Sequence, residues 1–218
     1  MPTRTPAAVL AAVSMMIAAP AAAQDVKPLP KAAPPAAASP AIATKPAPAR
    51  QAAPAADPFA AIPPARPADV ASIDAIVAAL YDVISGDKGV ERDWNRFRSL
   101  FYPGARMIPT GKSERTGKIN ARVVSPDTYI KSSESFLEGE GFHEQELARR
   151  VDSFGNIAQV FSSYEARHAV SEPKPFLRGI NSIQLFNDGN RWWVMSMAWS
   201  PETAEHPLPK AYSEKQQR

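Results

Sequence analysis

The chain of 218 residues contains no cysteine. It therefore forms no disulfide, carries no lipid on a cysteine and holds no metal through thiolates. Its three histidines, His143, His168 and His206, lack the spacing of a metal-ligand set. We expect neither a metal nor another cofactor, and the fold must be stabilised by an ordinary apolar core.

Common catalytic motifs and long apolar runs are missing as well. The sequence has no GxSxG, GxGxxG, phosphate-loop or HExxH motif. The apolar run over 7–19 is shorter than the roughly 20 residues of a membrane-spanning helix. It follows one positive residue, Arg4, and precedes small residues at 21–23, which is typical of a cleavable secretory signal. We predict a signal peptide over 1–23, a periplasmic or secreted location, and no stable membrane insertion after cleavage.

Glycine is absent from residues 24–68, which hold 12 of the 23 prolines and one aromatic residue, Phe59. Such a segment cannot bury enough apolar surface to offset the entropy of folding. We predict a disordered linker rich in proline and alanine. All glycines and the other aromatic residues follow it, so we predict one folded domain over 69–205 and a flexible tail over 206–218.

The predicted domain has no excess of positive charge. The chain carries a formal net charge of +3, but residues 69–205 hold 16 basic and 19 acidic side chains. A nucleic-acid-binding domain concentrates positive charge on its folded surface. We therefore expect no nucleic-acid partner.

Three segments have the apolar spacing of helices. Residues 69–85 repeat apolar side chains at three and four positions, and Gly86 provides a stop. A second helix is predicted over 91–101. A third begins where Ser125 serves as N-cap and Pro126 takes the first helical position.

The rest of the domain has the pattern of strands. Two short strand-like pieces surround a polar loop, and turn signals of Gly and Asn separate longer segments. We expect an antiparallel meander of four long strands over 141–154, 156–170, 176–187 and 191–200.

This order of elements resembles the nuclear transport factor 2-like superfamily, which includes ketosteroid isomerase, scytalone dehydratase and polyketide cyclases. The local resemblance is to secreted bacterial members of unassigned function. It lies in GNIAQVFSSYEARH at 155–168 and RGINSIQLFNDGNRWWVMSMAW at 178–199, within a match over 69–201. The resemblance implies an α+β fold in which a curved antiparallel sheet wraps around N-terminal helices as a cone with an internal pocket. It also implies homodimers that pair through the sheet.

The chain departs from ketosteroid isomerase at one place. That enzyme has a catalytic aspartate after the second helix, whereas residues 100–109 of this chain contain no carboxylate. The active site of that enzyme is therefore not carried over.

The strand at 141–154 carries candidate catalytic groups. Glu144 and Glu146 alternate and so share one face, while His143 and Arg149 share the other. Repulsion between close carboxylates raises the pKa of one and suits it to acid–base catalysis. Alternatively, both face solvent and pair with arginines such as Arg149. His143 is a second candidate base, as histidine is in scytalone dehydratase, or a partly buried structural side chain.

Candidate ligand-binding residues lie on the next strands. Tyr164 is positioned either to donate to a ligand carbonyl, as tyrosine does in an oxyanion hole, or to pack in the core. Asn181 stands in an apolar strand and needs a partner if it is buried. Arg178 either binds an anionic ligand or pairs with Glu165.

The last strand is apolar on both faces. Strict alternation predicts one stripe of Trp193, Met195, Met197 and Trp199, and an opposite stripe of Trp192, Val194 and Ala198. Methionine and tryptophan are typical of adaptable apolar pockets, so we include Trp199 among the candidate ligand-binding residues.

Three functions remain open. The favoured one is a binding module for a small, mainly apolar molecule, because a pocketed fold has aromatic and methionine stripes but no recognisable catalytic set. The second is a lyase or isomerase that uses a carboxylate or histidine base. The third is a domain for envelope assembly or interaction.

Overall fold

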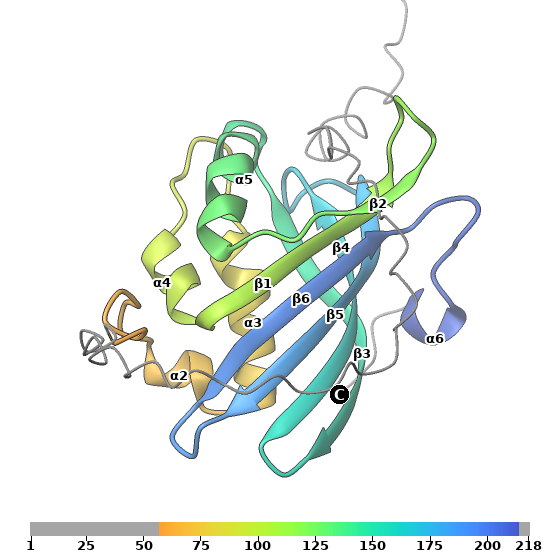
Figure 1. Cartoon of the computed structure of the whole chain (residues 1–218). Helices are drawn as coiled ribbons and strands as arrows, with labels where there is room; N and C mark the ends of the chain where they lie inside the picture. Colours follow the sequence, from red (N-terminus) through yellow and green to blue (C-terminus); the bar gives the residue numbers. More distant parts are fainter. Residues whose placement is uncertain (1–56, 214–218) are drawn as a thin grey trace, which may run out of the picture. The chain divides into compact units, whose positions relative to one another are not determined.

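The computed structural model describes residues 57–213 (Figure 1). The predicted signal peptide and most of the predicted linker lie outside the described residues. The helices are α2 (Pro67–Val70), α3 (Ile73–Ile84), α4 (Trp94–Ser99), α5 (Pro126–Glu140) and α6 (Lys210–Ser213). The strands are β1 (Phe101–Lys112), β2 (Ile119–Ala121), β3 (His143–Phe154), β4 (Ile157–Arg167), β5 (Leu177–Asn187) and β6 (Trp192–Pro201).

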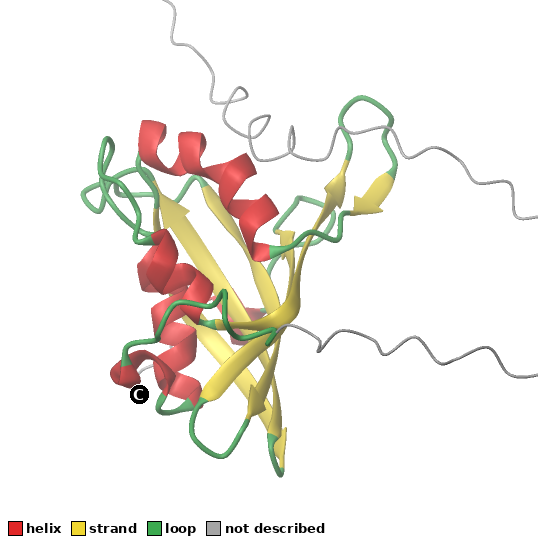
Figure 2. Ribbon diagram, turned by 60° about the vertical axis from the view of Figure 1, so that its left-hand side comes forward, coloured by secondary structure: helices red, strands yellow, loops and turns green. Residues whose placement is uncertain are grey.

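The six strands form one curved sheet in the order β2-β1-β6-β5-β4-β3 (Figure 1). From β3 to β6 each strand pairs antiparallel with the next, which confirms the predicted meander. β1 instead pairs parallel with β6. Helices α3, α4 and α5 lie on one face of the sheet (Figure 2). The predicted α+β fold with a curved sheet around helices is confirmed.

Side-chain caps decide where the helices begin. The Ser125 hydroxyl accepts a hydrogen bond from the Thr128 N–H (3.1 Å), as the predicted cap requires. The predicted helix over 69–85 is interrupted, because extended Ser72 caps α3 through the Ala75 N–H (3.0 Å). The second helix begins later than predicted because Asp93 caps it.

The core lies between α3 and the concave face of the sheet. Ile76, Val77 and Leu80 of α3 are buried there. Val160 of β4 and Ile183 of β5 are fully buried against the same core. Burial of each such side chain stabilises the fold by about 1.5–3 kcal/mol.

A β-bulge in β3 reverses the predicted alternation. The pairing with β4 shifts between Glu146 and Ala148, so Leu147 is an extra residue. The prediction that Arg149 faces away from Glu146 is therefore wrong. Beyond the bulge Arg149 lies on the same face, and its Nη2 is 3.1 Å from the Glu146 Oε2.

A second bulge corrects the predicted stripes of the last strand. The pairing of β6 with β5 shifts after Gln184, and Met195 is left without a partner. Trp193 consequently packs edge-on against Tyr102, with ring centroids 5.8 Å apart, while Met197 packs against the core. The prediction that Trp193 and Met197 share one stripe is wrong because the bulge turns them to opposite faces.

Buried Arg92, only 6% exposed, holds the junction of α3, α5 and β3. Its Nε donates to the carbonyl oxygen of Ile84 (3.0 Å), and its Nη2 donates to those of Gly86 (2.6 Å) and Leu137 (2.9 Å). Carbonyl groups at helix C-termini lack hydrogen-bond donors within their helix. Arg92 supplies donors to Ile84 at the end of α3 and to Leu137 near the end of α5. Gly86 also pairs through its backbone with Phe142, directly before β3.

Two short helices reach beyond the predicted domain, which spans residues 69–205. α2 begins at Pro67, and α6 lies within the predicted tail. The ring of Tyr212 in α6 packs edge-on against Phe161 of β4, with centroids 5.6 Å apart. Within residues 57–213, every helix is too short or too polar to cross a membrane.

Replacing Arg92 tests this junction. Arg92→Met removes the side-chain donor of the Ile84 and Leu137 carbonyl groups and one of the two donors of the Gly86 carbonyl group. We therefore expect the free energy of unfolding to fall by about 3 kcal/mol. Arg98→Met is the matched control, because Arg98 forms a partly exposed ion pair with Asp127 (2.7 Å) and should cost less than about 1 kcal/mol. Urea denaturation measures both, and equal losses would contradict the role of Arg92.

Candidate functional site

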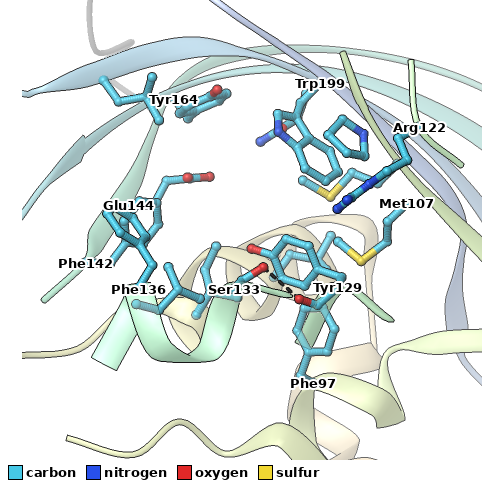
Figure 3. Close-up of a pocket in the computed structure, with 17 residues that line it drawn as sticks. Phe97, Met107, Arg122, Tyr129, Ser133, Phe136, Phe142, Glu144, Tyr164 and Trp199 are labelled. Atoms are coloured by element: carbon cyan, nitrogen blue, oxygen red, sulfur yellow. Dashed lines mark hydrogen bonds between the residues drawn. The ribbon is translucent and has the colours of Figure 1, made fainter. Parts of the chain in front are cut away.

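A cavity opens between the helices and the concave face of the sheet (Figure 3). The cavity has a volume of about 100 Å³. Its walls are mainly apolar and include Leu80, Phe97, Met107, Phe136, Leu137 and Met197. Four residues border both this cavity and a second hollow near the β1–β2 connection: Pro109, Tyr164, Leu177 and Trp199.

Glu144 is the one carboxylic acid among the described residues that line the cavity. Its backbone N–H donates to the Ser85 hydroxyl (2.9 Å), which ties β3 to the end of α3. Glu144 lies between this cavity and a hollow on the opposite side that His143 also borders, and the residue is partly exposed. Its carboxyl group is buried. This burial raises the pKa of Glu144 from 4.5 to about 8, although a hydrogen bond from Asn181 opposes the rise. At neutral pH the carboxyl group is therefore mostly protonated.

A directed chain of hydrogen bonds orients Asn181. The Ser162 hydroxyl donates its proton to Glu146 Oε1 (2.5 Å), so it accepts from the Tyr81 hydroxyl (2.7 Å). The Tyr81 oxygen in turn accepts from Asn181 Nδ2 (3.1 Å). The side-chain NH₂ of Asn181 is thereby held toward both Tyr81 and Glu144.

Glu146 anchors this chain of hydrogen bonds and does not line the cavity. Its carboxylate lies 3.1 Å from Arg149 Nη2, and Arg149 Nη1 lies 3.3 Å from Asp74. The predicted cause of a raised pKa, repulsion between Glu144 and Glu146, is wrong, because burial is what raises the pKa of Glu144.

Aromatic side chains form the walls next to Glu144. Tyr164 is buried on β4, and Gly179 leaves room for it, because a Cβ at that position would lie 2.5 Å from the Tyr164 hydroxyl. Trp199 packs edge-on against Tyr129, with ring centroids 5.9 Å apart. The cavity thus brings together four predicted site residues, whose roles stay predictions: Glu144, Tyr164, Asn181 and Trp199.

The other predicted site residues lie elsewhere. His143 Nε2 is 2.8 Å from Asp87 Oδ1, beside a hollow on the other side of Glu144. Arg178 Nη1 lies 3.4 Å from Glu202, and its Nη2 donates to the carbonyl oxygen of Ser213 (2.9 Å). In the part of the chain that the structure describes, no cluster of three or more His, Asp or Glu side chains can hold a metal ion.

No sequence pattern points to Arg122, which the fold brings to the cavity. It follows β2 in the connection to α5, and its side chain reaches in beside Met107 and Trp199 (Figure 3). Connections of this kind have neither the helical nor the strand period. A lone arginine in a polar loop therefore carries no signal that separates it from a surface residue.

The raised pKa of Glu144 predicts a pH effect on stability. Between about pH 4.5 and 8 the folded protein keeps a proton on Glu144 that the unfolded chain has released. Stability relative to Glu144→Gln should therefore be highest below pH 4.5 and fall by a few kcal/mol as pH rises to about 8. Urea denaturation across this pH range measures the difference. Glu140→Gln, an exposed control, should follow the wild-type curve, and parallel curves for wild type and Glu144→Gln would contradict the assignment.

No family model matches the sequence, and no curated protein matches it. Similar solved structures include nuclear transport factor 2-like proteins of unknown function from Silicibacter pomeroyi and Shewanella baltica. The first is 16% identical with a TM-score of 0.43 and covers 61% of this chain and 94% of that one. The second is 16% identical with a TM-score of 0.39 and covers 59% and 92%.

Identities at this level say nothing about function. The element order and the curved sheet with helices on one face agree with the fold that the sequence resemblance implied. The described domain has an α+β fold in which helices cover one face of a six-stranded curved sheet, and nuclear transport factor 2-like proteins are among the solved structures similar to it.

Proposed function

We propose that the cavity binds a small, mainly apolar molecule that carries a hydrogen-bond acceptor such as a carbonyl oxygen. The observation that supports this is the carboxyl group of Glu144, buried in an otherwise apolar cavity. Burying a carboxyl group without full hydrogen bonding costs free energy, and an apolar side chain would avoid that cost. A ligand carbonyl that accepts the Glu144 proton would give the buried acid a partner.

The aromatic walls suit the apolar part of such a ligand. Tyr129 stacks on Phe97, with ring centroids 5.6 Å apart, and Trp199 packs edge-on against Tyr129. Rings that already hold one another in place lose little freedom when a ligand arrives. Flat apolar surfaces of this kind favour an aromatic or alicyclic ligand.

The setting of this binding is part of the same proposal. If residues 1–23 act as a cleavable signal, binding takes place in the periplasm or outside the cell. A homodimer through the sheet and a role in envelope assembly stay predictions.

Benzylacetone, which has one phenyl ring and one ketone, is a suitable probe. Leu177 lines the cavity, so Leu177→Trp should fill part of the space and weaken binding about tenfold or more. Gln184 is exposed on the same strand, and Gln184→Trp should bind as wild type does. Isothermal titration calorimetry measures the affinities. Equal affinities for the two variants, or no binding to wild type, would contradict the proposal.

Proton transfer at carbon is a second function that this site supports. A general base works best when its pKa lies near the working pH, and the pKa of Glu144 is about 8. In a lyase or isomerase, the Glu144 carboxylate would remove a proton next to a ligand carbonyl. Asn181 or Tyr164 would donate to the carbonyl oxygen and stabilise the charge that develops there.

Hydrogen exchange distinguishes catalysis from simple binding. In deuterium oxide, a catalytic Glu144 should exchange the protons next to the benzylacetone carbonyl about a hundredfold faster than buffer does. Glu144→Gln should abolish this rate while the exposed control Glu140→Gln keeps it. Proton NMR follows the loss of signal. Binding without exchange above buffer would exclude this second function and leave the binding proposal intact.

A further inference from the structure

The end of the cavity opposite Glu144 carries a guanidinium group, that of Arg122 (Figure 3). Its Nε is buried and makes no hydrogen bond within the described residues, and no carboxylate of residues 57–213 forms an ion pair with it. Other partly buried arginines of this domain have partners: the guanidinium groups of Arg92 and Arg191 donate to backbone carbonyl oxygens. Arg96 lies 2.7 Å from Asp69. Arg122 is different because it faces an apolar cavity without a countercharge.

The backbone holds Arg122 in place. Its N–H donates to the carbonyl oxygen of Pro109 (3.1 Å). Val124, two positions on, exchanges two backbone hydrogen bonds of 2.9 Å with Met107. These bonds tie the connection to β1, so the guanidinium group projects from a fixed base. A site built on fixed backbone is suited to specific recognition.

The charges in the cavity do not balance. Glu144 is mostly protonated at neutral pH and lies across the cavity from Arg122. The cavity therefore holds one positive charge, partly removed from water and unpaired. A desolvated charge without a partner is costly, and a ligand with one negative charge would remove that cost.

We infer that the ligand is an apolar carboxylic acid whose carboxylate is bound by Arg122 while its apolar body lies against the cavity-facing sides of Tyr129 and Trp199. The planar guanidinium group matches a carboxylate with two parallel hydrogen bonds. A phosphate monoester, with close to two negative charges, would leave one charge unpaired in an apolar site. This inference rests on the proposed binding function and adds the charge of the ligand to it.

Two probes of one shape isolate the charge. Hydrocinnamate has a phenyl ring and a carboxylate, and hydrocinnamamide replaces the carboxylate with a neutral amide. Wild type should bind hydrocinnamate about tenfold or more tightly than the amide, because a charge-assisted pair replaces a neutral one. Isothermal titration calorimetry on the full chain measures both affinities.

Substitutions then assign the preference to Arg122. Arg122→Met should reduce the affinity for hydrocinnamate to that for the amide and leave amide binding unchanged, while Arg122→Lys should keep part of the preference. Arg106 is exposed on β1, next to a residue that faces the core. Arg106→Met removes the same charge outside the cavity and should bind both probes as wild type does.

Three results would overturn the inference. Equal affinity of wild type for the two probes, together with normal benzylacetone binding, would reject the carboxylate but keep the proposed function. A large rise in the pKa of Glu144 in Arg122→Met, seen in the pH dependence of stability, would show that Arg122 serves Glu144 instead of a ligand. Failure of all three probes to bind would reject the inference and the proposed function together.

Discussion

The guanidinium group of Arg92 joins the chain segments on which the cavity depends. It donates to carbonyl groups at the ends of α3 and α5 and to Gly86, which pairs with Phe142 at the start of β3. A Cβ at Gly86 would lie 2.5 Å from Arg92 Nη1, so a larger residue there would displace the guanidinium group from these carbonyl groups. Glu144 follows Phe142 by two positions, so the junction that Arg92 holds also decides where the buried acid stands.

The carboxyl group of Glu144 is unfavourable in an apolar cavity, and a chain of hydrogen bonds through Asn181 holds it there. A protonated carboxyl group among apolar walls contributes less to stability than a leucine would, and functional sites often carry such a cost. Asn181 is the polar partner of Glu144, and Asn181 is oriented by Tyr81, Ser162 and Glu146. Because the Ser162 hydroxyl donates to Glu146, which also pairs with Arg149, the chain of hydrogen bonds has one direction. The bulge at Leu147 makes this possible, since it turns Arg149 toward Glu146.

Particular residues show how far the sequence pattern reaches. Ser125 and Pro126 predict the start of α5 because a helix cap involves only near neighbours. Alternation predicts that Glu144 and Glu146 share a face, which holds up to the bulge and fails beyond it. A β-bulge depends on the partner strand, and neither Leu147 nor Met195 differs in type from an ordinary strand residue. The grouping of Trp193 with Met197 failed for that reason.

The sequence by itself determined the composition break near residue 68, the Ser125 helix cap, the antiparallel meander and the strand positions of Glu144, Tyr164 and Asn181. Each of these follows from local chemistry: backbone entropy, capping, turns and a period of two residues. Only the tertiary structure decided that burial raises the pKa of Glu144, that Glu146 is a structural anchor and that Arg122 meets the cavity without a countercharge. A pKa and an ion pair depend on burial and on groups distant in the sequence, so they exist only once the chain has folded.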